Sequence, residues 1–459
     1  MEKIIIKDAY ENNLKHINID IPLNAFTCVT GCSGCGKSSL VFDTIYAESQ
    51  RGFLEGMTGN IYGQKLMNKP KVGTIENLRP ALNISQNYYN VNPRSTIGTT
   101  TEISYYLRSL FAILNSSKDD NVSESIFSSN NPKSFCPHCS GLGVEKVVSK
   151  ALLIPDEDKT LKEGAIVFFK GGSESKEHKY LEALCEHYGI DISKKISELT
   201  EKELYILLYS DDKIKYKLSY KEGKRKKQHY VFLQGAVSAI MERVTQTDNT
   251  LSTAVYTKYM EDVPCHVCGG TKLRKEILAY KINGLNYYEI ENMELSSLND
   301  WLLEFNYDKV LKSKRELVFQ LITSILRKLN SLVQLNVGYL CLNRTIPSLS
   351  GGERQRIRIA TQLTCPLKGL IYILDEPSTG LHSHDVAKLI DVLQKIVDQG
   401  DTVIIIEHNL DMIKVADYII DLGPEGGDKG GKIIAKGTPR EVSQVEGSYT
   451  GQFLKKYFE

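Results

Sequence analysis

The feature that most constrains this chain is a glycine-rich loop between a predicted strand and a predicted helix. Residues Gly31–Ser38 read G-C-S-G-C-G-K-S and fit the pattern G-x-x-x-x-G-K-[ST]. The loop follows the apolar stretch 26–30 and precedes a helical pattern over 37–47, which is the strand–loop–helix context of a phosphate loop. Glycines allow consecutive backbone N–H groups to turn inward around phosphate oxygens. The sequence therefore predicts a nucleotide-binding domain of the α/β class.

The polar residues of this loop have expected roles. Lys37 would neutralise the β- and γ-phosphate oxygens, and the Ser38 hydroxyl would ligate Mg²⁺. Two thiols, Cys32 and Cys35, stand in the loop with Cys-x-x-Cys spacing, but a metal bound there would occupy the space of the phosphates. We therefore expect them to fill space, and the effect of their oxidation stays open. The predicted nucleotide-binding residues of the loop are Gly31, Cys32, Ser33, Gly34, Cys35, Gly36, Lys37, Ser38 and Ser39.

A second group of motifs lies towards the end of the sequence. The apolar stretch 370–374 has the pattern of a buried strand and ends in Asp375 and Glu376. Such an end places Asp375 near the Mg²⁺ and Glu376 beside an attacking water, as a general base. Residues 349–353 read L-S-G-G-E and lead into a predicted helix, whose N-terminus can hold an anion. From this segment we expect nucleotide contacts by Ser350, Gly351, Gly352 and Glu353.

These motifs, in this order, resemble those of the ATP-binding-cassette (ABC) ATPases. The resemblance makes Pro377–Gly380 the D-loop and His408 the switch histidine. It makes Gln86 the residue that senses Mg²⁺ and the γ-phosphate. The implied catalytic residues are thus Glu376, His408 and Gln86, and the implied magnesium ligands are Ser38, Asp375 and Gln86.

The cassette family also implies an assembly. Its members pair head to tail, so that the signature segment of one cassette closes over the phosphates bound by the other. This chain has one phosphate loop and one signature segment. The resemblance therefore implies a homodimer with two composite sites.

Four of the ten cysteines form two Cys-x-x-Cys pairs, Cys136/Cys139 and Cys265/Cys268. Thiolate pairs of this spacing supply Cys₄ zinc sites. One structural Cys₄ site is favoured, because four thiolates close the tetrahedron without help. Two separate sites, completed by His138 or His266, remain the alternative. Available thiols and the lack of a targeting or membrane-spanning stretch favour a cytoplasmic protein without a membrane partner.

Cassette motifs interrupted by these cysteine pairs resemble the UvrA class, the damage-sensing ATPases of bacterial nucleotide excision repair. The resemblance covers almost the whole chain and corresponds to the N-terminal half of a full-length member. It implies ATP, Mg²⁺ and Zn²⁺ as cofactors, double-stranded DNA as a partner, and no nuclease activity in the chain itself. Further matching stretches are 92–99 (N-P-R-S-T-I-G-T), 335–340 (L-N-V-G-Y-L), 350–360 and 421–424 (D-L-G-P).

In the UvrA class the region between the cysteine pairs is an insertion domain that contacts DNA. The net charge of the whole chain is only +1, but the stretch Lys213–Lys227 holds eight basic residues and one acidic residue. Such a stretch is either a solvated charged hairpin or a phosphate-contacting surface, and the resemblance favours the second. Stacking of Tyr216, Tyr220 or Tyr230 on bases or sugars is a weaker expectation. The predicted DNA contacts are Lys221, Lys224, Arg225, Lys226 and Lys227.

Two departures from full-length UvrA affect the expected function. Full-length UvrA carries two cassettes in tandem, and this chain carries one. It also carries a partner-binding domain before the first cysteine pair, whereas here only Ser116–Phe135 separates Asn115 from Cys136. Recruitment of the repair helicase is therefore in doubt. We expect DNA binding under ATP control, in damage recognition or in clearing a DNA-bound drug; a transporter ATPase subunit and a ribosome-associated cassette protein are the alternatives.

The length of 459 residues is too large for one core and suggests about three compact units. The expected fold is α/β, with an ABC-type ATP-binding core of the P-loop class, a signature domain, a zinc module and an inserted α+β domain. We expect the ATP-binding domain over 1–85 and 361–459 and the insertion domain over 147–262. The signature domain, with the two cysteine pairs, is expected over 86–146 and 263–360.

Overall fold

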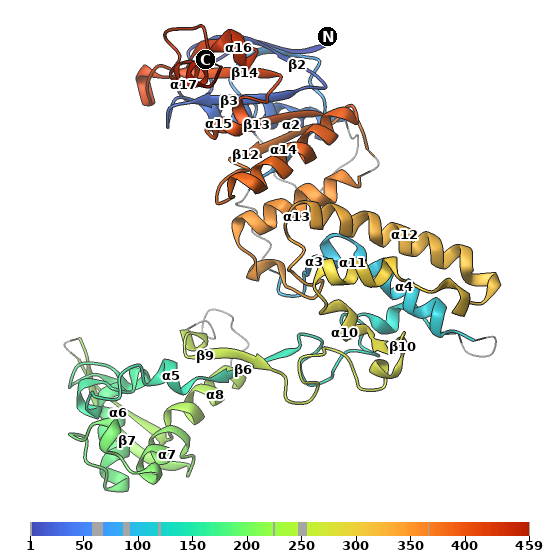
Figure 1. The fold of residues 1–459 in the computed structure, drawn as a ribbon. Coiled ribbons are helices and arrows are strands. Elements are labelled where there is room, and N and C mark those ends of the chain that lie inside the picture. Colours follow the sequence, from blue (N-terminus) through green and yellow to red (C-terminus); the bar gives the residue numbers. More distant parts are fainter. Residues whose placement is uncertain are drawn as a thin grey trace. The chain divides into compact units, whose positions relative to one another are not determined.

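The computed structural model describes residues 2–56, 68–85, 92–117, 121–223, 225–246, 255–365 and 367–458. The chain forms two compact units (Figure 1). Unit 1 contains the residues up to 128 and from 276 onward, and unit 2 contains residues 129–275. Both cysteine pairs thus lie in unit 2 with the insertion, while the ATP-binding and signature segments share unit 1. The five-segment division of the sequence stays a prediction within these units.

The main sheet of unit 1 places the carboxyl ends of its central strands at one edge. Neighbouring strands pair in parallel, except for the antiparallel pair at one end of the sheet. Parallel strands are buried on both faces and therefore appear as unbroken apolar runs. This confirms the strands predicted over 26–30 and 370–374. The order is β15 (Lys432–Gly437), β14 (Tyr418–Gly423), β3 (Phe26–Gly31), β13 (Thr402–Ile406), β12 (Ile371–Asp375) and β5 (Ala81–Ile84).

A second sheet of unit 1 contributes to the same hydrophobic core. It consists of β2 (Ile17–Pro22), β1 (Lys3–Ala9) and β4 (Val72–Glu76), paired antiparallel in that order. Its side chains alternate between a buried face and a wetter face, as in a half-buried sheet. The buried isoleucines of β1 and β2 pack with Ile373 and Ile404 of the main sheet.

The helical pattern predicted over 37–47 is confirmed and runs further than expected. α1 (Lys37–Leu40), the π-helical turn η1 (Val41–Tyr46) and α2 (Ala47–Gly56) follow one another without a break. α14 (Ser383–Asp398) forms the crossover between β12 and β13 that a parallel pair needs. The remaining helices of this part are α15 (Leu410–Ile413), α16 (Pro439–Val442) and α17 (Tyr449–Phe458).

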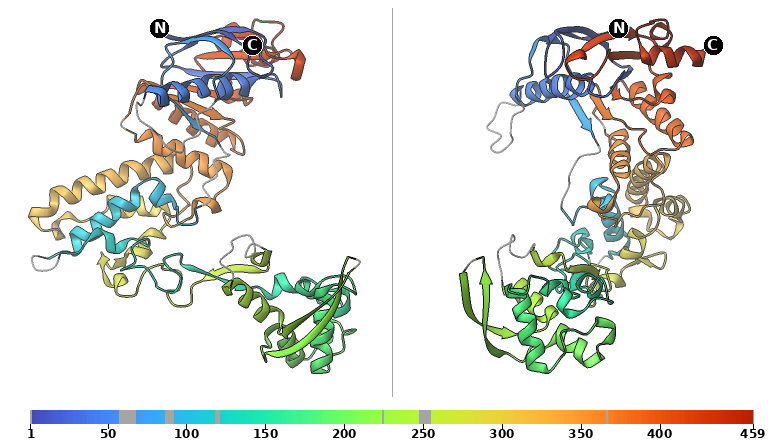
Figure 2. Two further views of the ribbon diagram at one scale, coloured as in Figure 1. Left: turned by 180° about the vertical axis from the view of Figure 1, so that it is seen from behind. Right: turned by 90° about the vertical axis from the view of Figure 1, so that its left-hand side faces the viewer.

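The rest of unit 1 is mainly helical. Residues 295–334 form two helices, α11 (Leu295–Leu303) and α12 (Lys312–Gln334), separated by a turn. α12 lies along α4 (Ile103–Asn115) (Figure 2), and Lys314 Nζ donates 2.7 and 2.8 Å hydrogen bonds to carbonyls at the end of α4. Among the described residues, no helix is both long and apolar enough to span a membrane. The other elements are α3 (Ile97–Thr100), β10 (Lys281–Ile282), β11 (Leu285–Asn286), α10 (Tyr287–Glu291) and α13 (Gly351–Leu363).

Unit 2 is an α+β body entered and left through one strand pair. β6 (Val144–Val148) pairs antiparallel with β9 (Met260–Pro264), and the chain between them forms a separate hydrophobic core that includes Leu184, Leu207 and Leu233. A long hairpin lies at the edge of this unit (Figure 2). The remaining elements are α5 (Lys150–Leu153), α6 (Lys176–Tyr188), α7 (Glu201–Tyr209), β7 (Ile214–Glu222), β8 (Arg225–Leu233) and α8 (Ala236–Gln246).

We predict opposite effects of alanine at two glycines of the loop–helix segment. Gly31 has a φ of +130°, and an added Cβ would lie 2.1 Å from the Leu422 carbonyl oxygen and 2.7 Å from Cys35 Sγ. Gly31→Ala should lower the free energy of unfolding by at least about 3 kcal/mol, or prevent folding, because strain and overlap add. Gly52 lies in α2 with no atom within 4 Å of its Cβ position, so Gly52→Ala should raise stability by up to about 1 kcal/mol. Urea midpoints test the pair; equal midpoints would contradict the loop geometry.

Candidate functional site

The phosphate-loop residues Gly31–Ser38 form an arch at the carboxyl end of β3. Lys37 Nζ lies within this arch and donates 2.8 Å hydrogen bonds to the carbonyl oxygens of Gly31 and Cys32. Gly34 and Gly36 have φ angles of 73° and 106°, which favour glycine because other residues are strained there. β3 lies between β13 and β14, and the carboxyl edge of such a sheet is where ligands bind.

Two asparagines that sequence reasoning missed brace this loop. Asn13 Nδ2 donates to the Gly34 carbonyl oxygen at 2.8 Å, and its Oδ1 lies 3.4 Å from Ser39 Oγ. Asn12 Nδ2 donates to Asp43 Oδ2 at 2.8 Å. Both residues follow β1, so the turn after this strand of the second sheet supports the loop. The sequence of this polar turn, which lies outside the motif, does not indicate such a contact.

The structure brings two of the predicted catalytic side chains together. Glu376 follows β12 and His408 follows β13, and Glu376 Oε1 lies 3.6 Å from His408 Nδ1. Glu376 has a φ of 41°, and its N–H donates to the Ile406 carbonyl oxygen at 2.9 Å. This bond ties the general-base candidate to the neighbouring strand. Gln86, the third predicted catalytic residue, lies outside the described residues.

Asp375 lies in surroundings that disfavour its ionised form. Burial raises the pKa of this carboxyl above its ordinary value, the neighbouring Glu376 and Glu407 raise it further, and Lys37 lowers it. Asp375 therefore interacts with the phosphate-loop lysine from the adjacent part of the sheet. A desolvated carboxylate among other acids is stabilised when a divalent cation binds beside it.

Two buried side chains that sequence reasoning missed hold this edge in place. Glu407 is 1% exposed and accepts hydrogen bonds from the backbone N–H groups of Ser378 (3.0 Å), His408 (2.7 Å) and Asn409 (2.9 Å). Gln355 of α13 donates to carbonyl oxygens of Ile84 and Asp375 at 3.2 Å each. The segments after β12 and β13 are therefore fixed to each other, and α13 is fixed to the sheet.

The signature residues form the first turn of α13. Ser350 Oγ accepts from the Glu353 N–H at 3.3 Å, and the Glu353 carboxylate accepts from the Ser350 N–H at 2.7 Å, which is a capping box. Gly351 and Gly352 lie between them. Within the described part of the chain, residues 350–353 share no hydrogen bond with the phosphate loop 31–38. The signature segment thus forms a separate helix N-terminus in unit 1.

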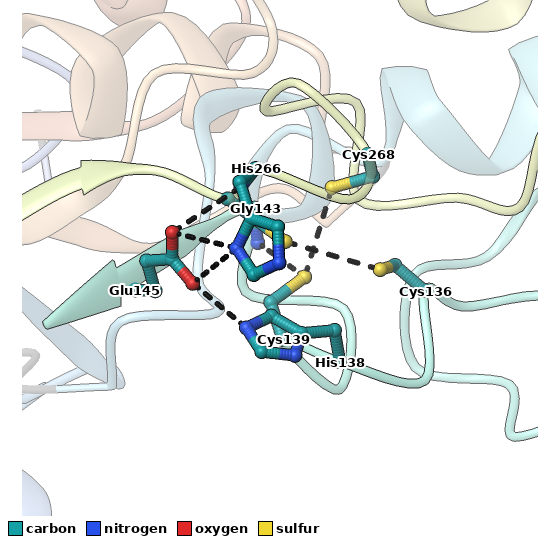
Figure 3. Close-up of polar contacts among 8 residues, drawn as sticks. Cys136, His138, Cys139, Gly143, Glu145, His266 and Cys268 are labelled. Carbon is teal, nitrogen blue, oxygen red and sulfur yellow. Dashed lines mark hydrogen bonds and ion pairs between the residues drawn. The ribbon is translucent and has the colours of Figure 1, made fainter.

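The four predicted zinc ligands lie in one cluster (Figure 3). The pairing of β6 with β9 places the two cysteine pairs side by side, with Val144 opposite Pro264. The sulfurs of Cys136 and Cys265 are 4.0 Å apart and those of Cys139 and Cys268 are 3.8 Å apart. A zinc tetrahedron with Zn–S bonds of about 2.3 Å has S···S edges of about 3.8 Å. The cluster therefore fits a single Cys₄ site.

The basic hairpin β7–β8 has two different faces. Its register pairs Lys217 with Tyr230 and Lys221 with Lys226 on an exposed face, where Lys215 Nζ lies 4.9 Å from the Tyr230 ring centre. Lys221 is also paired with Glu174, at 3.2 Å. This exposed face combines lysines with an aromatic ring.

The other face of the hairpin is turned towards the core of unit 2. Tyr220 is buried and Tyr216 is half-buried against that core. Burial therefore contradicts the expectation that Tyr220 stacks on DNA, while stacking of Tyr216 stays a prediction. Arg225 and Lys227 alternate with Lys226 and lie on this second face near the tip. Lys224 lies outside the described residues. The predicted DNA contacts are therefore divided between two faces.

Comparisons with known proteins agree with this geometry. Residues 150–258 match the family model of the UvrA DNA-binding domain. UvrABC system protein A of Staphylococcus aureus (strain MRSA252) is 31% identical over 593 residues, covering 98% of this chain and 62% of the relative. The protein of the same name from Agrobacterium fabrum is 29% identical over 616 residues, covering 99% of this chain and 63% of the relative.

The fold comparison gives the same relationship. The crystal structure of UvrA2 from Deinococcus radiodurans superposes with a TM-score of 0.72 at 30% identity, covering 99% of this chain and 58% of that one. The chain thus spans about three fifths of the length of the relatives it matches. Over nearly its whole length, in sequence and in fold, the chain is similar to the UvrA proteins.

Proposed function

We propose that this chain is a UvrA-like ATPase that binds DNA under the control of ATP binding and hydrolysis, in DNA damage recognition during nucleotide excision repair. The observation that carries the proposal is one chain combining the nucleotide site of unit 1 with the matched DNA-binding segment of unit 2. Its relatives named UvrABC system protein A support the repair role. A transporter ATPase or a ribosome-associated protein would not need that segment.

In the proposed reaction, each residue at this edge of the main sheet has a separate role. Lys37 exchanges its bonds to the Gly31 and Cys32 carbonyls for bonds to the β- and γ-phosphate oxygens. Glu376 accepts a proton from the water that attacks the γ-phosphorus. The bond between the γ-phosphorus and the oxygen that bridges the β- and γ-phosphates breaks, and ADP leaves. His408, 3.6 Å from Glu376, positions this carboxylate and the γ-phosphate. Ser38 and Asp375 would hold Mg²⁺, whose positive charge offsets that of the phosphates.

The signature segment supports a head-to-tail homodimer. Ser350 is exposed, the α13 N-terminus is capped by its own residues, and the Tyr339 hydroxyl donates to Glu353 at 2.6 Å. A helix N-terminus attracts an anion through its free N–H groups. In the proposed dimer, residues 350–353 of one chain close on the nucleotide bound by 31–38 of the other.

The cysteine cluster supports a structural zinc ion. Cys136, Cys139, Cys265 and Cys268 would hold it, and bound zinc would hold the base of the insertion together. The Gly143 N–H donates to Cys139 Sγ at 3.2 Å, an outer contact of the kind that orients metal ligands. No open ligand position is needed, so the proposed role is structural.

The exposed face of the β7–β8 hairpin is the proposed DNA contact. Lysines on this face would neutralise phosphates, and counterion release makes that binding strongly salt-dependent. Tyr230 is 65% exposed beside Lys215, so its ring is available to stack on a base or sugar. The proposed DNA contact is thus limited to this face and is smaller than the set of residues expected from the sequence.

The chain lacks residues that its relative contains. The aligned stretch of 593 residues is longer than this chain of 459, and only residues 116–135 join α4 to the first cysteine pair. We propose that the surface recruiting the repair helicase is missing. The same observation favours a second function, release of a DNA-bound drug, which needs ATP-driven DNA contact but no helicase. Deleting the gene should then increase sensitivity to DNA-binding antibiotics; unchanged sensitivity would exclude this function.

The first prediction of this proposal concerns the general base. Glu376→Gln should reduce ATP hydrolysis by at least about 100-fold, because a positioned base contributes that much, while ATP binding persists. ATP should also shift this variant towards the dimer. Steady-state phosphate release and light scattering measure the two effects. Glu446→Gln, at an exposed carboxylate of unit 1, is the control; hydrolysis near the wild-type rate in Glu376→Gln would contradict the assignment.

The second prediction concerns Asp375 in the absence of nucleotide and Mg²⁺. Its raised folded-state pKa means that the ionised carboxylate destabilises the fold. This cost is absent below the unfolded-state pKa of about 3.9 and develops as the pH rises through the folded-state value. Asp375→Asn should therefore have a higher Tm than the wild type at pH 7, and the difference should shrink in acid. Asp428→Asn, at an exposed position of the short 3-10 helix Gly427–Lys429, should show no such trend. A lower Tm at neutral pH would refute the electrostatic account.

The third prediction concerns the exposed hairpin face. Lys217→Gln with Lys226→Gln should weaken duplex DNA binding and reduce the slope of log K against log salt by about one per lost phosphate contact. Lys162→Gln with Lys202→Gln removes the same charge from exposed positions elsewhere in unit 2 and is the matched control. Filter binding over a salt series measures both. Equal slopes for the two double variants would place the DNA contact elsewhere.

A further inference from the structure

A second set of metal-type donors lies beside the cysteine cluster, and the proposed zinc site does not use it. Glu145 of β6 faces one histidine from each cysteine pair (Figure 3). Its Oε2 lies 2.7 Å from His138 Nε2, and His266 Nδ1 lies 3.0 Å from both of its oxygens. The two imidazole rings meet edge to face with centres 4.5 Å apart.

The donor chemistry of this group is that of a divalent transition metal. Imidazole nitrogens and carboxylate oxygens are borderline donors that bind Zn²⁺, Co²⁺ and Ni²⁺. A thiolate is also close, because Cys265 Sγ lies within 4.8 Å of the donor atoms of His138 and Glu145. His138, Glu145 and Cys265 form one donor group, and His266, whose Nδ1 contacts Glu145, would supply the fourth ligand once its ring turns towards the other donors.

The geometry needs only small side-chain movements to accept an ion. Bonds of about 2.0 Å give donor–donor edges of about 3.3 Å in a tetrahedron, slightly longer than the observed 2.7 and 3.0 Å. The His138 and His266 side chains are 44% and 66% exposed, so their rings can turn. Glu145 is more constrained, since its Oε1 also accepts from the His266 backbone N–H at 3.3 Å. The carboxylate is thus a fixed anchor and the rings are its adjustable partners.

We propose that His138, Glu145 and His266 bind a second divalent transition-metal ion next to the Cys₄ site, with Cys265 as a thiolate ligand shared by both ions. The four donors come from both ends of the insertion, before and after residues 150–258. The second ion therefore cross-links β6 to the turn after β9 and stiffens the base of the matched DNA-binding segment. Imidazole and carboxylate donors make it the weaker and more exposed of the two sites.

The test measures the number of metal ions bound per chain after the protein is equilibrated with micromolar free Zn²⁺. The wild type should hold two zinc ions per chain. His138→Gln with His266→Gln should hold one, and with Co²⁺ in place of zinc it should keep the strong thiolate-to-cobalt absorption of a Cys₄ site. His187→Gln, which removes an exposed histidine from α6 of the same unit, should still hold two. Circular dichroism should show that all three proteins are folded.

Each other result overturns the inference. One zinc in the wild type means that no second ion binds, although the Cys₄ proposal would stand. Two zinc ions in the double histidine variant place the second ion elsewhere. Loss of both ions from that variant means that the histidines only support the cysteine cluster. ATP hydrolysis and DNA binding are measured separately, so failure of the second metal site is distinct from failure of the proposed function.

Discussion

The nucleotide site depends on the register of three parallel strands. β12 pairs with β13 so that Asp375 lies opposite Ile406, and β13 pairs with β3 so that Ile406 lies opposite Val29. The residues that follow these positions, Glu376, the Glu407–His408 segment and Gly31, therefore emerge at one edge. A slip of one residue would turn each side chain to the opposite face. Chemistry encoded at three distant places in the sequence thus becomes local through this strand pairing.

A similar constraint in unit 2 joins both ends of the insertion. The ladder from Val144–Pro264 to Val148–Met260 closes a long chain segment, and closing such a loop is entropically costly. Metal ligands on both sides of the ladder would offset that cost, since a bound ion stabilises the folded form in which its ligands meet. The thiol cluster and the His138–Glu145–His266 group both occupy this position.

The sequence allows prediction of features that depend on local pattern. The loop Gly31–Ser38, the buried strands and the capping box at Ser350 follow from glycine spacing, apolar runs and Ser–Glu spacing. Contacts that depend on how distant segments pack together could not be predicted. Nothing in the sequence distinguishes Glu407 from other acidic residues, and the role of Gln355 depends on α13 lying against β12. The hairpin shows the same limit, because alternation of side chains assigns Tyr230 to the exposed face only once its pairing with Lys217 is known.

Charge balance at the sheet edge links nucleotide binding to assembly in the proposed mechanism. Asp375, Glu376 and Glu407 place three carboxylates near one lysine. Burial, and then repulsion from the other two carboxylates, raises the pKa of Asp375. A triphosphate adds further negative charge, so Lys37 alone leaves the site under-neutralised. Under the proposal, Mg²⁺ held by Ser38 and Asp375 would supply part of the missing charge, and the N–H groups at the start of a partner's α13 would supply more. ATP would then favour the proposed closed dimer over the open one, and loss of the γ-phosphate would remove the charge that holds the two chains together.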